Sequence, residues 1–87
     1  MKESIKMDRL GVGDCAIVYR LENATEMRRR LQDIGLIEGT VIECIGKSPG
    51  GDPHAYLIRG AVIAIRAADA HEITVLPCQR GVVKPWG

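Results

Sequence analysis

Apolar residues recur in five short segments of the chain. Residues 14–21, 40–45, 55–59, 61–66 and 73–76 are rich in Val, Ile, Leu, Tyr and Thr. Short runs of β-branched and aromatic residues bounded by turn-forming residues are typical of strands. In the first segment, Ala16 and Val18 fall on one face of such a strand and Cys15 and Ile17 on the other. The pattern predicts five short β-strands.

One stretch has the periodicity of a helix instead. Apolar side chains recur at a spacing of three or four residues at Ala24, Met27, Leu31 and Ile34. Asn23 is a candidate N-cap, because its side chain can accept a backbone hydrogen bond at the start of a helix. Gly35 suits the left-handed residue that follows many helices. We expect one short amphipathic helix between the first two strands.

Glycine and proline mark the turns between these elements. Gly35, Gly39, Gly51 and Pro53 are explained most simply by backbone geometry, as residues that permit positive φ or fix a tight turn. Residues 69–71 predict a brief helical turn before the last strand. From Pro77 onward alternation is lost, so we expect one domain over residues 1–76 and an appended tail over residues 77–87.

These elements predict a mainly β domain with one or two short helices. About five short strands with a helix after the first indicate a small, strongly bent β-barrel, because closing a sheet hides its edges. The length of 87 residues allows one domain with a modest core that does not enclose a large active site. A binding module fits this size better than an enzyme.

Charge and hydropathy narrow the classes of function. The net charge of +1 gives no general basic field, so nucleic-acid binding would need a local patch. No apolar run approaches the roughly 20 residues of a membrane span, and the amino terminus lacks the apolar centre of a signal peptide. We expect a cytoplasmic protein that does not itself span a membrane and is not an enzyme.

The segment Gly46-Lys47-Ser48 matches the second half of a phosphate-binding P-loop. The complete motif needs a glycine at position 41, where this chain has Val, and a helix that begins at the lysine. Two prolines and two glycines follow within residues 49–53 and disfavour a helix. We therefore interpret residues 46–53 as a loop and expect no nucleotide or other cofactor.

Cysteine and histidine do not form a recognisable metal motif. Cys15, Cys44 and Cys78 are far apart in the sequence, and none belongs to a C-x-x-C pair. His54 and His71 are the remaining candidate ligands, and neither has a second ligand at the spacing of a zinc site. We predict no built-in metal site, with His54 and His71 as the candidates if one exists.

Candidate partner contacts gather on the predicted helix. Arg28, Arg29 and Arg30 are the densest charge in the chain, although Glu26 with Arg30 and Arg29 with Asp33 can form i,i+4 ion pairs. Partner contact and a solvated helix face both explain the arginines. The candidate contact residues are Met27, Arg28, Arg29, Leu36 and Trp86, where Met27 and Leu36 also fit a core role and Trp86 fits a docking anchor in the tail.

The ordered motifs resemble a known family. The segments "LGVGDCAIV", "MRRRLQDIGLIEGTVIECI" and "SPGGDPHAYLIRGAVIAIRAADAHEITV" together resemble the FeoA family, the small accessory proteins of bacterial ferrous iron transport. The resemblance covers residues 10–75. It implies an SH3-like barrel whose partner is the membrane ferrous iron permease, which carries a GTP-binding domain.

Two other classes of function stay open from the sequence. Small barrels can bind nucleic acid, but three aromatic residues provide few stacking platforms, so we expect no nucleic-acid partner. Folding could also bring His54, His71 and the cysteines together in a transition-metal carrier, or allow a transient contact with ferrous iron. The resemblance favours a regulatory protein that binds the cytoplasmic side of the permease.

Overall fold

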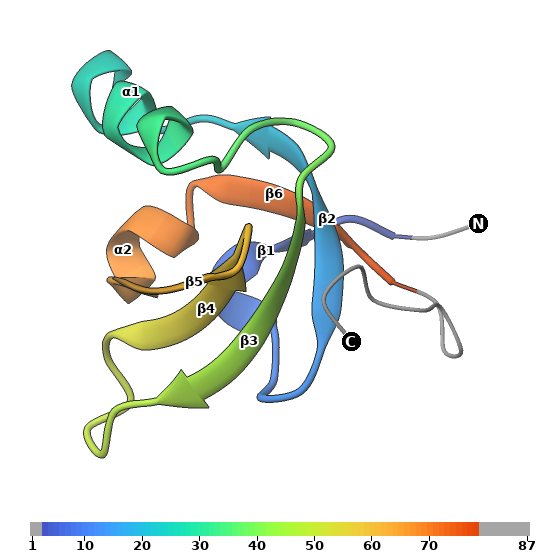
Figure 1. Cartoon of the computed structure of the whole chain (residues 1–87), viewed down its shortest axis with the longest axis vertical. Coiled ribbons are helices and arrows are strands. Elements are labelled where there is room, and N and C mark those ends of the chain that lie inside the picture. The colour runs from blue at the N-terminus through green and yellow to red at the C-terminus, as the bar shows by residue number, and fades with distance from the viewer. Residues whose placement is uncertain (1–2, 79–87) are drawn as a thin grey trace.

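The computed structural model describes residues 3–78 as one antiparallel sheet with short helices around it (Figure 1). The sheet contains six strands, and the helices are one 3-10 turn and two α-helices. In chain order the elements are β1 (Ile5–Lys6), η1 (Met7–Arg9), β2 (Cys15–Leu21), α1 (Thr25–Asp33), β3 (Val41–Lys47), β4 (His54–Ile58), β5 (Ala61–Ile65), α2 (Ala67–Ala70) and β6 (Ile73–Pro77).

The spatial order of the strands is β1-β6-β2-β3-β4-β5. The β2–β6 pairing joins the two ends of the domain, and β3, β4 and β5 follow as successive antiparallel neighbours. The register shifts between Val18 and Arg20 on β2 and between Cys44 and Gly46 on β3. Such irregularities increase the local twist of a strand, which helps a short sheet to bend around its core.

The mainly β architecture and all five predicted strands are confirmed, and a sixth strand was missed. β1 has two residues, too few to show any alternation, and it pairs with Thr74 and Val75 of β6. The 3-10 turn that follows buries Met7 completely. The amino-terminal segment therefore contributes to the core.

The segment that resembles half of a P-loop belongs largely to a strand. β3 continues to Lys47, two residues beyond the predicted end, and pairs there with His54 of β4. The remaining residues 48–53 connect β3 to β4, with Gly51 at φ +86° and a cis peptide bond before Pro53. No helix begins at Lys47, so the expectation of a loop holds for residues 48–53 and is wrong for the first two positions.

Helix α1 occupies residues 25–33 within the predicted segment, but its start differs from the prediction. The N-cap is Ala24, and within residues 3–78 no side chain caps the helix. Asn23 is buried and instead donates a hydrogen bond from Nδ2 to the Asp69 carbonyl of α2, at 3.0 Å. The assignment of Asn23 as the N-cap was therefore wrong, because its side chain makes a tertiary hydrogen bond to α2 instead of capping α1. Among the described residues, no helix combines the length and hydrophobicity that crossing a bilayer requires.

The ion pairs of α1 are formed in part. Arg30 donates to Glu26 at 3.2 Å, as the i,i+4 spacing predicts, and both side chains are mostly exposed. Arg29 and Asp33 form no ion pair among the described residues. Exposed pairs contribute at most about 1 kcal/mol each, so packing rather than charge holds α1 in place.

Gly35 marks the end of α1 and is restricted in two ways. Its φ of +99° lies in the left-handed region, and a Cβ at this position would approach Arg59 Cδ to 2.6 Å.

Arg59 itself has φ +50° and, with Gly60 at +83°, forms the two-residue connection between β4 and β5. Positive φ at both central positions is the geometry of the tight hairpin turn that matches strand twist. Gly39 likewise has φ +90°.

The core lies between the curved sheet, η1 and the two α-helices. Its fully or nearly buried apolar members are Met7, Leu10, Ala16, Val18, Leu21, Leu31, Leu36, Ile42, Cys44, Tyr56, Ile58, Ile65, Ala70, Ile73 and Val75. Tyr56 is the largest side chain in this set, and its hydroxyl donates to the Met7 carbonyl at 3.4 Å. This hydrogen bond connects β4 to the amino-terminal turn η1.

The end of β6 explains how a proline fits inside a sheet. Pro77 lies opposite Ala16 of β2, and the neighbouring residue Cys78 donates its backbone N–H to the Cys15 carbonyl at 2.9 Å. Hydrogen-bonded and non-bonded pairs alternate along an antiparallel ladder, so Pro77 occupies a position that needs no N–H toward β2. Strand pairing therefore continues to the last described residue. Residues 79–87, including Trp86, lie outside the described residues.

Replacing Gly35 by alanine is expected to destabilise the protein by about 1–2 kcal/mol, because a side chain with left-handed φ is strained. Urea unfolding monitored by circular dichroism measures the change. Gly50→Ala is the matched control, because its φ is not left-handed and no atom lies within 4 Å of the added Cβ. An equal stability of the two variants would contradict the role of Gly35.

Alkaline pH is expected to destabilise the protein through Tyr56. Burial raises the pKa of this phenol well above its ordinary value near 10. The phenolate is therefore favoured in the unfolded chain, so stability is fully present below about pH 10 and falls above it by up to about 1.4 kcal/mol per pH unit. Burial also raises the pKa of the Cys44 thiol, which adds a further loss in the same direction.

Urea unfolding of Tyr56→Phe between about pH 9 and 11.5 tests this, since removing the phenol flattens the slope above its ordinary pKa. Tyr19→Phe, which removes a half-exposed phenol, is the matched control. If Tyr56→Phe kept the wild-type slope, the alkaline loss would have another source.

Candidate docking groove

A groove runs between helix α1 and strand β5. Its volume is about 280 Å³, and it is lined by Met27, Arg30, Leu31 and Ile34 from α1 and by Ile63, Ala64, Ile65, Arg66 and Asp69 from β5 and the start of α2. The helical residues recur every three or four positions, so one face of α1 forms one wall. Five of the nine lining side chains are Met, Leu or Ile. The groove is thus lined mainly by apolar side chains, with three charged residues among them.

Strand β5 contributes an unpaired edge to this groove. It is the last strand of the sheet and pairs only with β4 among the described strands. The residues that flank the two-residue hairpin, Ile58 and Ala61, form a hydrogen-bonded pair, and bonded pairs then alternate along the ladder. The backbone groups of Val62 and Ala64 therefore point away from β4. Both side chains are also exposed, with Val62 at 65%.

Exposed apolar edge strands readily pair with another chain. Many proteins protect such an edge with lysine, proline or a bulge, or cover it with another segment. The sequence of β5, Ala-Val-Ile-Ala-Ile, contains none of these residues, and the ladder with β4 is regular from end to end. This edge is consequently suited to accept an extended segment of a partner.

Arginines form the charged rim of the groove. Arg30 and Arg66 line it directly, and the Arg59 side chain packs over Gly35 just beyond the end of α1. Glu26 pairs with Arg30, and Asp69 is the acidic residue that lines the groove. Of the charged side chains that line the groove, two are positive and one is negative. This rim favours an occupant that carries acidic residues.

The three consecutive arginines of α1 are separated by the geometry of the helix. Successive residues of an α-helix are separated by about 100°, so Arg28, Arg29 and Arg30 point in three directions. Arg30 borders the groove, Arg29 is exposed, and Arg28 lines a separate polar hollow with Leu21, Gln32, Ile37 and Glu38. The three charges do not form one continuous surface.

The other predicted contact residues lie in different surroundings. Met27 is half-buried, packs against the core and lines the groove, so it can contribute to both. Leu36 is completely buried, and its prediction as a partner contact was wrong, because the turn after α1 directs it into the core. Its alternative core role is confirmed. The groove residues Ile63 and Arg66 were missed, since only the β4–β5 hairpin brings them opposite α1.

The two histidines occupy different surroundings. His54 is buried at the start of β4, and its Nδ1 lies 3.3 Å from the Tyr56 hydroxyl. His71 is exposed at the end of α2, and its Nδ1 lies 3.2 Å from an Asp8 carboxylate oxygen. Within residues 3–78, no three His, Cys, Asp or Glu side chains gather in a cluster that could hold a metal ion.

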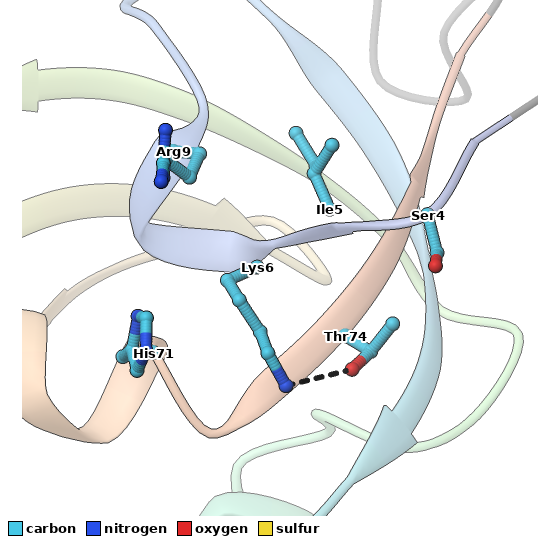
Figure 2. A pocket seen from close by; sticks show the side chains of 6 residues that line it. All are labelled: Ser4, Ile5, Lys6, Arg9, His71 and Thr74. Atoms are coloured by element: carbon cyan, nitrogen blue, oxygen red, sulfur yellow. Dashed lines mark hydrogen bonds between the residues drawn. The ribbon is translucent and has the colours of Figure 1, made fainter.

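A second, larger hollow lies beside the amino-terminal strand (Figure 2). Its volume is about 550 Å³, and it is lined by Ser4, Ile5, Lys6, Arg9, His71 and Thr74. Lys6 Nζ extends to the Thr74 hydroxyl and also to Glu22, each at 3.4 Å. His71 is held by Asp8. Two of the three basic side chains therefore have acidic partners, and the hollow presents no concentrated positive charge.

Solved structures share this arrangement of strands. The solution structure of the FeoA protein from Chlorobium tepidum is 31% identical, with a TM-score of 0.84 over 95% of this chain and 79% of that one. FeoA from Stenotrophomonas maltophilia, described as an SH3 domain protein and solved in complex with zinc, is 25% identical, with a TM-score of 0.70 over 79% of this chain and 86% of that one. The expectation of an SH3-like domain is therefore confirmed.

A curated relative links the same domain to transport. It is the Fe(2+) transport protein A/Fe(2+) transporter FeoB fusion protein of Porphyromonas gingivalis, which is 30% identical over 71 residues. The match covers 82% of this chain and 8% of the relative, so this chain corresponds to a small part of that protein. Residues 5–77 match the FeoA domain. The chain therefore belongs to the FeoA domain family, which is associated with ferrous iron transport.

Proposed function

We propose that this protein is a non-enzymatic accessory protein of ferrous iron uptake that binds the cytoplasmic side of the ferrous iron permease. The observation that carries the proposal is the Porphyromonas gingivalis relative, which joins a homologous domain and a FeoB transporter in one polypeptide. Linking two modules makes their contact intramolecular and greatly raises its effective concentration. A fusion of this kind supports a direct contact between the corresponding separate proteins.

The docking site in this proposal is the groove between α1 and β5. An extended segment of the permease's cytoplasmic GTP-binding domain adds to the β5 edge through the backbone groups of Val62 and Ala64. Strand addition derives affinity from main-chain hydrogen bonds and specificity from alternate side chains. Here alternate apolar side chains contact Met27 and Ile34, while acidic residues lie near Arg30 and Arg66.

Regulation by this route requires a difference between two states of the partner. A protein that binds both nucleotide states of the GTP-binding domain equally well shifts neither of them. We therefore propose that the docked domain prefers one nucleotide state. The preference changes the conformation or the nucleotide cycle of the permease without any chemistry in the accessory protein itself.

Titration with the isolated GTP-binding domain, followed by amide NMR with and without a GTP analogue, tests the contact. We expect localised shifts at α1 and β5, together with slowed hydrogen exchange at the Val62 and Ala64 amides, because strand addition gives these N–H groups acceptors. Gly50, in the β3–β4 connection at the end of the molecule away from α1, is the internal control (Figure 1). Shifts confined to that connection would contradict the docking site.

Removing the two arginines that line the groove is expected to weaken binding. The double variant Arg30→Ala/Arg66→Ala loses the positive rim, and we expect about tenfold lower affinity, equivalent to about 1.4 kcal/mol. Arg20→Ala/Lys47→Ala is the matched control, because it removes the same charge from exposed positions on β2 and β3. Calorimetry at low and high salt measures both variants. Equal losses in the two would indicate general charge attraction instead of this groove.

A further inference from the structure

Two of the three cysteines, from opposite ends of the domain, lie directly across from each other in the sheet. The β2–β6 register pairs Ile17 with Leu76 and Ala16 with Pro77. One step further, Cys78 donates its backbone N–H to the Cys15 carbonyl at 2.9 Å. Cys15 and Cys78 are therefore the next cross-strand pair of this ladder. Both are thiols in the structure.

The two side chains project from the same face of the sheet. Directly opposite residues of an antiparallel pair lie on one face, and successive residues alternate between faces. Ala16 and Val18 are buried in the core, so Cys15 lies on the outer face with Ile17. Cys15 and Cys78 are each partly exposed. A small oxidant can therefore reach this pair from solvent.

The third cysteine, Cys44, differs in the residue opposite it and in its access to solvent. Cys44 lies on β3, is completely buried among core side chains and pairs with Tyr56 of β4. Burial also raises the pKa of its thiol, which keeps it protonated and unreactive. The chain consequently contains one accessible pair of thiols and one enclosed thiol.

The pairing geometry is compatible with a bond between the two sulfur atoms. Hydrogen-bonded residues of an antiparallel pair have Cα atoms about 5.5 Å apart, and disulfides span Cα separations of about 4.4–6.8 Å. A hydrogen-bonded pair of this kind thus has a Cα separation within the range that a disulfide spans. A bond across it needs only rotation of the two side chains and a small approach of their Cβ atoms.

We propose that Cys15 and Cys78 form a modification site, a reversible intramolecular disulfide made by exchange with a low-molecular-weight disulfide. One cysteine thiolate attacks a sulfur of the small disulfide, breaks its S–S bond and releases one small thiolate. The other cysteine thiolate then attacks the resulting mixed disulfide at the protein sulfur and releases the second small thiolate. The two protein thiols lose two electrons and two protons, and the small disulfide is reduced to two thiols.

The bond ties the middle of the sheet to the residue that follows β6. It joins β2, which lies between β6 and β3, to the point where the chain continues into residues 79–87. Oxidation therefore locks the end of the β2–β6 ladder, where no further described strand pairing holds it. Reduction restores two thiols at the same place.

Oxidised glutathione is the probe for this site. The folded full-length protein is treated with it and then unfolded in denaturant, so that the alkylating reagent also reaches the buried Cys44 thiol. The intact mass is measured without reduction. We expect two of the three cysteines to resist alkylation, with a loss of two hydrogen atoms and no retained glutathione. Proteolysis without reduction then yields the Cys15 and Cys78 peptides as one cross-linked species, in the wild type and in Cys44→Ser.

The single variants separate this pairing from other thiol reactions. Cys15→Ser and Cys78→Ser are each expected to stop at the mixed disulfide with glutathione, because no second thiol lies opposite to displace it. Peptide mapping of the wild type needs no variant, so the test stands even if a variant fails to fold. A stable mixed disulfide on the wild type, a cross-link through Cys44, or a disulfide-linked dimer as the main product would each overturn the proposal.

Discussion

The pairing of β2 with β6 is the constraint on which the remaining structure depends. It joins a strand near the start of the domain to the last strand, so its formation closes residues 22–72 into a loop, and this costs conformational entropy that later contacts must offset. Once β6 is in place, β1 gains its partner, and the Glu22 N–H donates to the Glu72 carbonyl at 2.8 Å. The contact of Asn23 with α2 follows from the same arrangement.

The two edges of the sheet, β1 and β5, differ in how much unpaired backbone they offer to a partner. At the β1 edge only two residues are paired, and Lys6 reaches across to Thr74 and Glu22, so little backbone is available there. At the β5 edge five regular residues carry small and apolar side chains. Because an unpaired strand is a template for another chain, the second edge is the one suited to binding. Helix α1 stands beside it and forms the opposite wall of the groove.

A small SH3-like domain of this kind has little interior to use for chemistry. Its buried residues are nearly all apolar, and the largest, Tyr56, serves to connect β4 with the amino-terminal turn. Surface features therefore carry the recognition in the proposed function: a strand edge, an apolar groove and a rim of arginines. These features lie on elements that the core fixes firmly, since Leu31 of α1 and Ile65 of β5 are both buried beside the groove. A partner would then meet a preorganised surface, which lowers the entropic cost of binding.

The sequence by itself determined the elements whose signals are local. Alternating apolar residues specified five strands, helical spacing specified α1, and glycine positions specified turns, because each depends on neighbours a few residues away. Tertiary structure decided the rest. The two-residue β1 exists only where β6 offers an edge, Asn23 bonds to α2 instead of capping α1, and Leu36 turns into the core. The groove and the Cys15–Cys78 pair likewise depend on strand order and register, which arise from contacts between residues distant in the chain, and no local pattern encodes these.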